Sequence, residues 1–252
     1  MVMVAVSIFL SVFLVSLISF VGIAALSLNK KALQGILLVL LAFGAGTLLG
    51  GALFDIIPEA MRLGGGTALQ YIAVGIVLFF IIERFIHWHH HHHNEGLDHR
   101  DRVRPFAYLN LIGEGIHNFL DGTIIAASYL VSFEIGIIAT IAIIFHEIPQ
   151  ELGDFGILVQ GGIPVKKALL YNFLVALTSV IGAAVILFSS FLLPSLTVIM
   201  LSIAGGGFLY IALSNLIPEL HHETSLKKTI IQVIFLILGI GLLYSLGIVF
   251  PE

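Results

Sequence analysis

The sequence predicts an all-α polytopic membrane protein with eight transmembrane helices in a 3+2+3 inverted-repeat arrangement. The first observation is the composition. The 252-residue chain is 59% hydrophobic and only 10% charged, whereas soluble domains are about 45–50% apolar and about 25% charged. The second is that uncharged segments of membrane-spanning length recur along the chain. The third is a motif near residue 50 that recurs in a later span of opposite predicted direction.

The same composition excludes several classes of protein. A soluble enzyme and a disordered chain are both excluded by the high apolar content. Nucleic-acid binding is excluded because the 11 Lys and Arg residues are dispersed and the net charge is −4. The chain contains no Cys, so disulfides, thiolate metal ligands and Cys nucleophiles are excluded as well.

Eight spans are predicted because about 20 residues cross the hydrocarbon core. We expect the first segment to be a retained helix and not a signal peptide, since it has no basic start and no small-residue cleavage site. Uncharged residues 168–218 are long enough for two helices, separated at Leu193-Pro194-Ser195. The other predicted spans cover residues 2–28, 32–54 with an apolar continuation to about residue 60, 63–82, 106–133, 135–159 and 229–251.

The basic residues predict the orientation of these spans. Ten of the eleven Lys and Arg residues fall on one side of the predicted membrane, and only Arg62 falls on the other. An excess of Lys and Arg marks the cytoplasmic side. We therefore expect both termini outside and the loop after the third span in the cytoplasm, in a protein of the plasma membrane.

An internal repeat links the second and seventh predicted spans. Residues 46–59 (GTLLGGALFDIIPE) and 206–219 (GGFLYIALSNLIPE) are identical at seven of fourteen positions, including a shared Ile-Pro-Glu. Because the two spans run in opposite directions, the pattern is typical of inverted-repeat transporters; the alternative is chance similarity between small-residue apolar helices. It predicts one transmembrane domain with a first three-helix repeat at 1–88, a cytoplasmic His-rich loop at 89–104, a central helix pair at 105–162 and a second three-helix repeat at 163–252.

Spans four and five carry polar residues that the membrane disfavours. Each ionised side chain at the bilayer centre costs about 2.5–3.5 kcal/mol, so a bound cation or a water-filled cavity is expected to offset them. The alternative is a helix kinked at Pro149 whose polar face packs on another helix. The polar residues recur at helical spacing in each span: Glu114, His117, Asn118 and Asp121 in span four, and His146, Glu147, Gln150, Glu151 and Asp154 in span five.

Imidazole and carboxylate groups together favour a transition metal over Na⁺ or K⁺. At these residues the sequence resembles the ZIP family of divalent metal transporters, through HNFLDG (117–122) and HEIPQELGDF (146–155). The resemblance covers essentially the whole chain. It implies transport of Zn²⁺, with Mn²⁺, Fe²⁺ and Cd²⁺ as further substrates, into the cytoplasm by an elevator-like motion, in a homodimer without an organic cofactor.

The resemblance also implies a binuclear metal site between spans four and five. One metal would be held by His117, Asp121, His146 and Gln150. The other would use Asn118 and Glu147, with ligands shared from neighbours. Glu151 is a further expected ligand, and Glu114 and Asp154 are expected along the pathway.

Two features of the sequence qualify this expectation. The most similar subfamily has His where this chain has Gln150, which predicts a weaker preference for Zn²⁺ and more tolerance of Mn²⁺ or Fe²⁺. Asp55 and Asn215 precede the two Ile-Pro-Glu motifs, where the family sometimes has His. Glu59 and Glu219 are expected either in the metal pathway or simply at the water interface.

The predicted cytoplasmic loop is rich in histidine. Seven of the eleven histidines fall within thirteen residues, and flexible imidazoles bind metal without a fixed geometry. We expect the run to modulate transport without being essential; the alternative is a solvated linker. The residues concerned are His89, His90, His91, His92 and His93.

Two other functions compete with metal transport. His146-Glu147 resembles the start of HExxH, which would indicate an intramembrane zinc metalloprotease. The second His is missing because residue 150 is Gln, and a protease gives no reason for the repeat. A proton-coupled antiporter for monovalent ions would explain the carboxylates but not the paired histidines.

Overall fold

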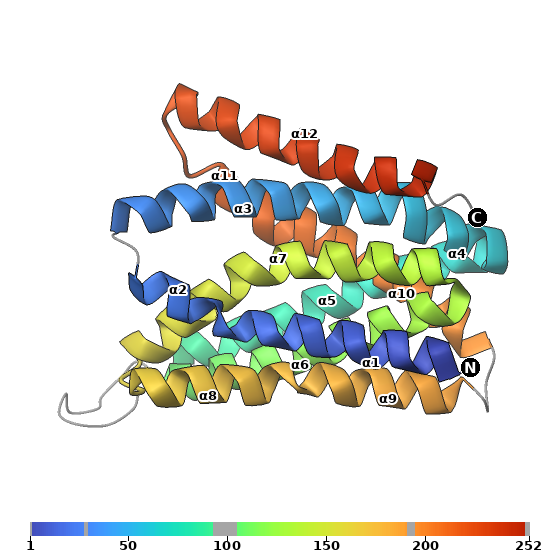
Figure 1. Cartoon of the computed structure of the whole chain (residues 1–252), viewed down its shortest axis with the longest axis horizontal. Helices are drawn as coiled ribbons and strands as arrows, with labels where there is room; N and C mark the ends of the chain where they lie inside the picture. The colour runs from blue at the N-terminus through green and yellow to red at the C-terminus, as the bar shows by residue number, and fades with distance from the viewer. Residues whose placement is uncertain (1, 28–29, 93–104, 191–194, 250–252) are drawn as a thin grey trace.

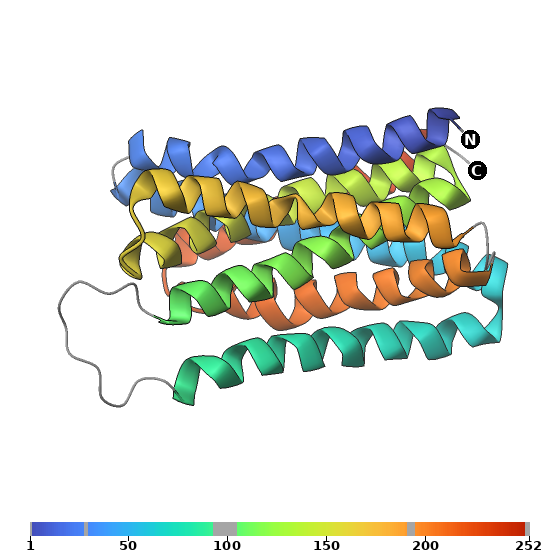
Figure 2. The same cartoon turned by 90° about the horizontal axis from the view of Figure 1, so that it is seen from below.

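The computed structural model describes residues 2–27, 30–92, 105–190 and 195–249, and within these ranges it contains helices and no strand. The helices run along one common axis and form a single bundle (Figures 1 and 2). The start of α1 and the end of α12 lie at the same end of this bundle (Figure 1). Its largest apolar core contains buried residues from the first helix to η3.

The first part of the chain crosses the bundle three times. The first pass consists of α1 (Val2–Ser16), the 3₁₀ turn η1 (Leu17–Phe20) and α2 (Val21–Ser27). The second consists of α3 (Lys30–Gly50), a π-helical segment η2 (Gly51–Ile56) and α4 (Ile57–Gly64). The chain then reverses at Gly65, whose φ of 57° favours glycine, and continues as α5 (Gly66–His92).

Two long helices follow. They are α6 (Pro105–Val131) and α7 (Phe133–Gln160). The reversal between them is fixed at Ser132, whose hydroxyl caps α7 by accepting a hydrogen bond of 3.1 Å from the Ile135 N–H. Pro149 lies inside α7, and the later part of this helix changes direction in Figure 1. The helix therefore continues through the proline, with a bend of the kind that the sequence predicts.

The last part of the chain repeats features of the first. It consists of α8 (Val165–Ala176), α9 (Thr178–Ser189), α10 (Ser195–Tyr210), a second π-helical segment η3 (Ile211–Leu216), α11 (Ile217–Leu220) and α12 (Leu226–Val249). The break predicted at Leu193-Pro194-Ser195 falls mainly on residues 191–194, which lie outside the described residues, and α10 begins at Ser195. Both π-helical segments are six residues long and lie directly before an Ile-Pro-Glu.

Seven helical segments in the described residues are long and apolar enough to cross a membrane. The chain is therefore an integral multi-pass membrane protein. The predicted fourth span, α6, is not among the seven, because its Glu, His, Asn and Asp side chains lower its hydropathy. The seven segments are Val2–Ile23, Gly35–Gly64, Gly66–Arg84, Phe133–Val159, Val165–Ser189, Ser195–Leu220 and Leu226–Val249.

Glycine allows three pairs of helices to approach with their backbones in contact. In α6 and α9, a Cβ on Gly122 would overlap the Ser179 carbonyl group, and a Cβ on Gly182 would overlap that of Phe119. Equivalent reciprocal pairs are Gly46 with Gly239, between α3 and α12, and Gly75 with Gly206, between α5 and α10. Small residues are common where membrane helices associate, since lipid gives little hydrophobic drive for packing larger ones.

Candidate metal centre

The antiparallel pair α6 and α7 brings the predicted polar residues of the two helices together. His117 Nε2 lies 3.3 Å from His146 Nε2 and 3.1 Å from Glu147 Oε1. His146 Nε2 lies 3.3 Å from Asp121 Oδ2 and 3.2 Å from Glu147 Oε1. The distance from His117 Nε2 to Asp121 Oδ2 is 3.8 Å. These four residues, His117, Asp121, His146 and Glu147, are called the four-ligand cluster below.

The spacing of the four-ligand cluster suits a small tetrahedral cation. Zinc binds nitrogen and oxygen at about 2.0–2.2 Å, so neighbouring ligand atoms of a regular tetrahedron lie roughly 3.3–3.6 Å apart. The five measured separations run from 3.1 to 3.8 Å, and all four atoms lie within 4.8 Å of one another. The cluster could therefore hold one such ion after only small side-chain movements.

The surroundings of the cluster call for a positive charge. Asp121, His146 and Glu147 are buried, and His117 is partly buried. Both Asp121 carboxylate oxygens are buried without a hydrogen-bond partner among the described residues. No Lys or Arg occurs in the sequence between Arg104 and Lys166. A buried carboxylate without such compensation is costly, and a bound cation would supply the compensation.

A second group of carboxylates adjoins the first. One oxygen each of Glu114, Glu147 and Glu151 lie within 4.8 Å of one another, so Glu147 belongs to both groups. Asn118 donates a 2.7 Å hydrogen bond to Glu114 Oε1, while the Asn118 amide oxygen has no hydrogen-bond partner among the described residues. The geometry could thus hold two ions that share Glu147.

Gln150 contacts the second group of carboxylates. Its amide nitrogen donates a 3.0 Å hydrogen bond to Glu114 Oε2. The role of Gln150 as a metal ligand stays a prediction. The hydrogen bond to Glu114 holds the Gln150 side chain on the side of the second group of carboxylates.

Comparison with known proteins adds to this geometry. A profile of the ZIP zinc transporters matches residues 2–105 and 89–247. The chain belongs to the ZIP zinc transporter family. Members of this family are transporters and not enzymes, so the protease alternative is not supported.

Three individual relatives, two of them named as zinc transporters, are similar to this chain. Zinc transporter zipt-7.2 of Caenorhabditis elegans is 30% identical over 285 residues, which cover 87% of this chain and 60% of that protein. Zinc transporter ZIP13 of Danio rerio is 40% identical over 150 residues, covering 59% of this chain and 43% of that protein. IAA-alanine resistance protein 1 of Arabidopsis thaliana is 35% identical over 158 residues, 62% of this chain and 34% of that protein. The chain thus spans between a third and two thirds of the length of these relatives.

Two asparagines of this ZIP chain support the site although no sequence motif includes them. Asn172 of α8 donates a 2.7 Å hydrogen bond to Glu151 Oε2, and Asn110 of α6 donates a 2.8 Å hydrogen bond to Asp154 Oδ1. Asn172 is almost fully buried. A single amide in an otherwise apolar stretch of α8 is the signal that could have revealed it.

A cavity of about 270 Å³ leads from the cluster to one end of the bundle. His117 lies at its inner limit, and the predicted pathway residues Glu114 and Asp154 line it together with Gln150 and Asn215. Glu83 of α5 and Asn110, near the start of α6, also line it. This end of the bundle is the one where α6 begins and α7 ends (Figures 1 and 2).

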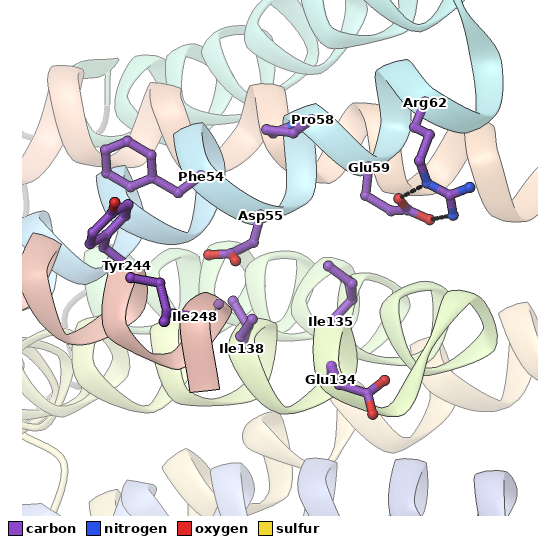
Figure 3. Close-up of a pocket in the computed structure, with 11 residues that line it drawn as sticks. Phe54, Asp55, Pro58, Glu59, Arg62, Glu134, Ile135, Ile138, Tyr244 and Ile248 are labelled. Atoms are coloured by element: carbon purple, nitrogen blue, oxygen red, sulfur yellow. Dashed lines mark hydrogen bonds and ion pairs between the residues drawn. The ribbon is translucent and has the colours of Figure 1, made fainter. Parts of the chain in front are cut away.

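Asp55 and Glu59 are not brought to the cluster. They line a separate pocket of about 350 Å³ at the opposite end of the bundle, with Glu134 and Arg62 (Figure 3). Glu219, the repeat counterpart of Glu59, is exposed and lines neither of these cavities.

The histidine run lies largely outside the described residues. The helix α5 continues to His92, so the backbone of His89, His90, His91 and His92 is helical, where the sequence predicts the start of a loop. Their side chains, and all of His93 and residues 94–104, lie outside the description.

Proposed function

We propose that this chain carries divalent transition metals, with Zn²⁺ as the preferred substrate, across the membrane into the cytoplasm. The observation that carries the proposal is the four-ligand cluster, in which two imidazole nitrogens and two carboxylate oxygens converge inside a bundle of membrane-length helices. Family membership supports the same substrate. A Na⁺ or K⁺ antiporter is disfavoured because imidazole is a poor ligand for these ions.

For the membrane topology, we propose eight spans, with α6 as the additional one. The end of α12 and the start of α1 lie at the same end of the bundle (Figure 1), as an even number of crossings requires. The 27 residues of α6 are long enough to span, and their polar side chains face α7 instead of lipid.

The 3+2+3 arrangement is supported by features that recur 160 residues apart. The π-helical segments η2 and η3 have this offset, and so do Gly46 and Gly206, each of which packs against the third helix of the other repeat. On this basis we propose the repeats 1–88 and 163–252, the linking loop 89–104 and the central pair 105–162. We also propose that the cavity that reaches His117 opens toward the cytoplasm, which the ten Lys and Arg residues on that side of the predicted membrane support. The homodimer and the plasma-membrane location stay predictions from the sequence.

For the metal preference, we propose a binuclear site with Glu147 as the shared ligand, and Mn²⁺, Fe²⁺ and Cd²⁺ as further substrates. Replacing Gln150 with His is expected to raise the preference for Zn²⁺, because imidazole is the softer and stronger zinc ligand. Competition of Mn²⁺ and Fe²⁺ against Zn²⁺ uptake, measured for both proteins, tests this. Identical competition profiles would rule out a role of residue 150 in selectivity.

For the histidine run, we propose a modulatory role on the cytoplasmic side. Deleting residues 89–93 is expected to change the apparent affinity or regulation of transport while leaving transport itself, since a flexible tract fixes no metal geometry. Concentration-dependent uptake by the deletion variant measures both quantities. Complete loss of uptake in a correctly folded variant would show that the run is essential.

The proposed function is tested by Zn²⁺ entry into proteoliposomes loaded with a zinc-sensitive dye. Saturable influx that exceeds the leak of protein-free liposomes is expected. If the folded protein gives no influx above that leak, zinc transport is not its main function, and uptake of Mn²⁺, Fe²⁺ and then monovalent ions would be measured next.

A further inference from the structure

The two ends of the bundle differ in their access to the four-ligand cluster. The 270 Å³ cavity, called the inner cavity below, reaches His117. The 350 Å³ pocket at the other end, called the outer pocket, contains no cluster residue. Ile138 lines the floor of this outer pocket, and Ala142 and then His146 follow it on α7 at intervals of four residues. Ile138 is almost fully buried and Ala142 is fully buried. Gly51 of η2 packs against Ile138 and Ala142, since a Cβ added there would lie within 4 Å of both side chains. The structure is thus open toward the inner end and sealed toward the outer one.

Glu59 lies at this sealed outer end although it is a carboxylate with only 3% of its surface exposed. Arg62, one turn later on α4, donates hydrogen bonds to both Glu59 oxygens through Nε and Nη2 (Figure 3). The Arg62 side chain itself is 64% exposed. Burial of an unpaired carboxylate is costly, while burial of one bound by a guanidinium fork is tolerated. Glu59 and Arg62 are called the closure pair below.

The repeat offers an internal comparison for this pair. At an offset of 160 residues, Glu59 and Arg62 correspond to Glu219 and His222. Both of these are exposed, and in the described part of the chain no ion pair joins their side chains. The counterpart carboxylate at the open end is therefore hydrated and needs no cation, whereas the carboxylate at the sealed end is dehydrated and has one.

We propose that Arg62 permits the outer end of the pathway to close, by neutralising Glu59 when closure removes that carboxylate from water. The proposal rests on the proposed function, since alternate closure of two ends belongs to a transporter. In the outward-open state Glu59 is hydrated, and the ion pair contributes little to the free energy of that state because exposed pairs are weak. The pair therefore stabilises one state of the transport cycle over the other.

The proposal is tested by thiol labelling, which is clean because the chain has no native Cys. The outer reporter is Ile138→Cys, at the buried floor of the outer pocket, labelled by a membrane-impermeant maleimide in right-side-out vesicles. The inner reporter is Asn215→Cys, in the inner cavity, labelled in inverted vesicles. Both measurements are made without metal and so do not depend on transport.

In the Arg62→Gln background, the outer reporter is expected to label roughly tenfold faster and the inner reporter more slowly, the population change that follows from losing a charge-assisted pair. Adding Glu59→Gln is expected to return both rates to within about twofold of the parent, because a neutral amide is buried at a smaller cost. Arg84→Gln, an exposed arginine at the other end, is the matched control and is expected to leave the outer rate unchanged.

Two results would overturn the proposal: an unchanged outer rate in folded Arg62→Gln, or an open outer end that Glu59→Gln does not reverse. If Arg62→Gln fails to fold, repair by Glu59→Gln supports the pair and persistent misfolding contradicts it. Zinc transport is judged separately. If the parent protein gives Zn²⁺ influx but Arg62→Gln leaves the labelling rates unchanged, only the role of the closure pair is rejected. If Arg62→Gln changes the labelling rates but the parent protein gives no influx, only the transport proposal is rejected.

Discussion

Replacing His146 with Ala is expected to abolish saturable Zn²⁺ influx into proteoliposomes. The His146 ring is fully buried, and its Nε2 lies within 3.3 Å of a ligand atom of each other member of the four-ligand cluster. The variant leaves three ligands and an uncompensated void, and losses of more than about 100-fold in zinc affinity are expected for a ligand, since even residues that only support ligands contribute 10–100-fold. Influx at equal reconstitution and zinc binding by calorimetry measure the effect.

The control for this prediction is another histidine of the same chain. His221 is exposed after α11. It belongs neither to the four-ligand cluster nor to the second group of carboxylates, so His221→Ala is expected to retain influx and binding. Retention of influx by a folded His146→Ala variant would place the transported ion elsewhere. Loss of influx with unchanged zinc binding would separate binding from translocation.

Replacing Gly122 with Ala is expected to destabilise the protein strongly. The added methyl group would overlap the Ser179 carbonyl group of α9, and because this is backbone and not a flexible side chain, the two helices would have to separate. A cost of about 3 kcal/mol or more is expected for such overpacking, which corresponds to a fall in Tm of roughly 6–12 °C. Thermal unfolding of the detergent-solubilised protein, followed by size exclusion, measures it.

The matched control is Gly241→Ala on α12. A Cβ at position 241 meets no atom within 4 Å, so this variant is expected to keep its Tm or gain slightly, as Ala favours the helix by about 1 kcal/mol. Equal melting of the Gly122 and Gly241 variants would show that α6 and α9 separate easily, in conflict with the contact described above.

Seven of the eight predicted spans, and the pairing of α6 with α7, follow from the sequence because they depend on hydropathy and helical spacing. His117, Asp121 and His146 are predicted together for the same reason, and the structure brings them together. The contacts of Glu147 and Gln150 do not follow from spacing. They depend on which neighbours the side chains meet, and the hydrogen bond from Gln150 to Glu114 requires the register of two helices.

Other features depend on contacts across the fold. Asn172 meets Glu151 from α8, and no spacing within α7 indicates such a partner. The π-helical segments η2 and η3 are equally hidden, because an apolar stretch has the same hydropathy whether its backbone forms α or π turns. The repeat of residues 46–59 locates both segments but does not reveal their backbone geometry.

The π-helical segments have a consequence for helical phase. An α-helix turns about 100° per residue, and a π turn accommodates one residue more than an α turn, so the faces before and after η2 are out of step. Before it, Gly46 and Gly50 face α12; after it, Ile57 faces Gly205 of α10. The continuous helical segment formed by α3, η2 and α4 can thereby pack on one neighbour in its first half and on another in its second. With η3 at the equivalent place, each repeat has one such change of phase, directly before its Ile-Pro-Glu, and the direction in which Glu59 and Glu219 point is set by a single extra residue.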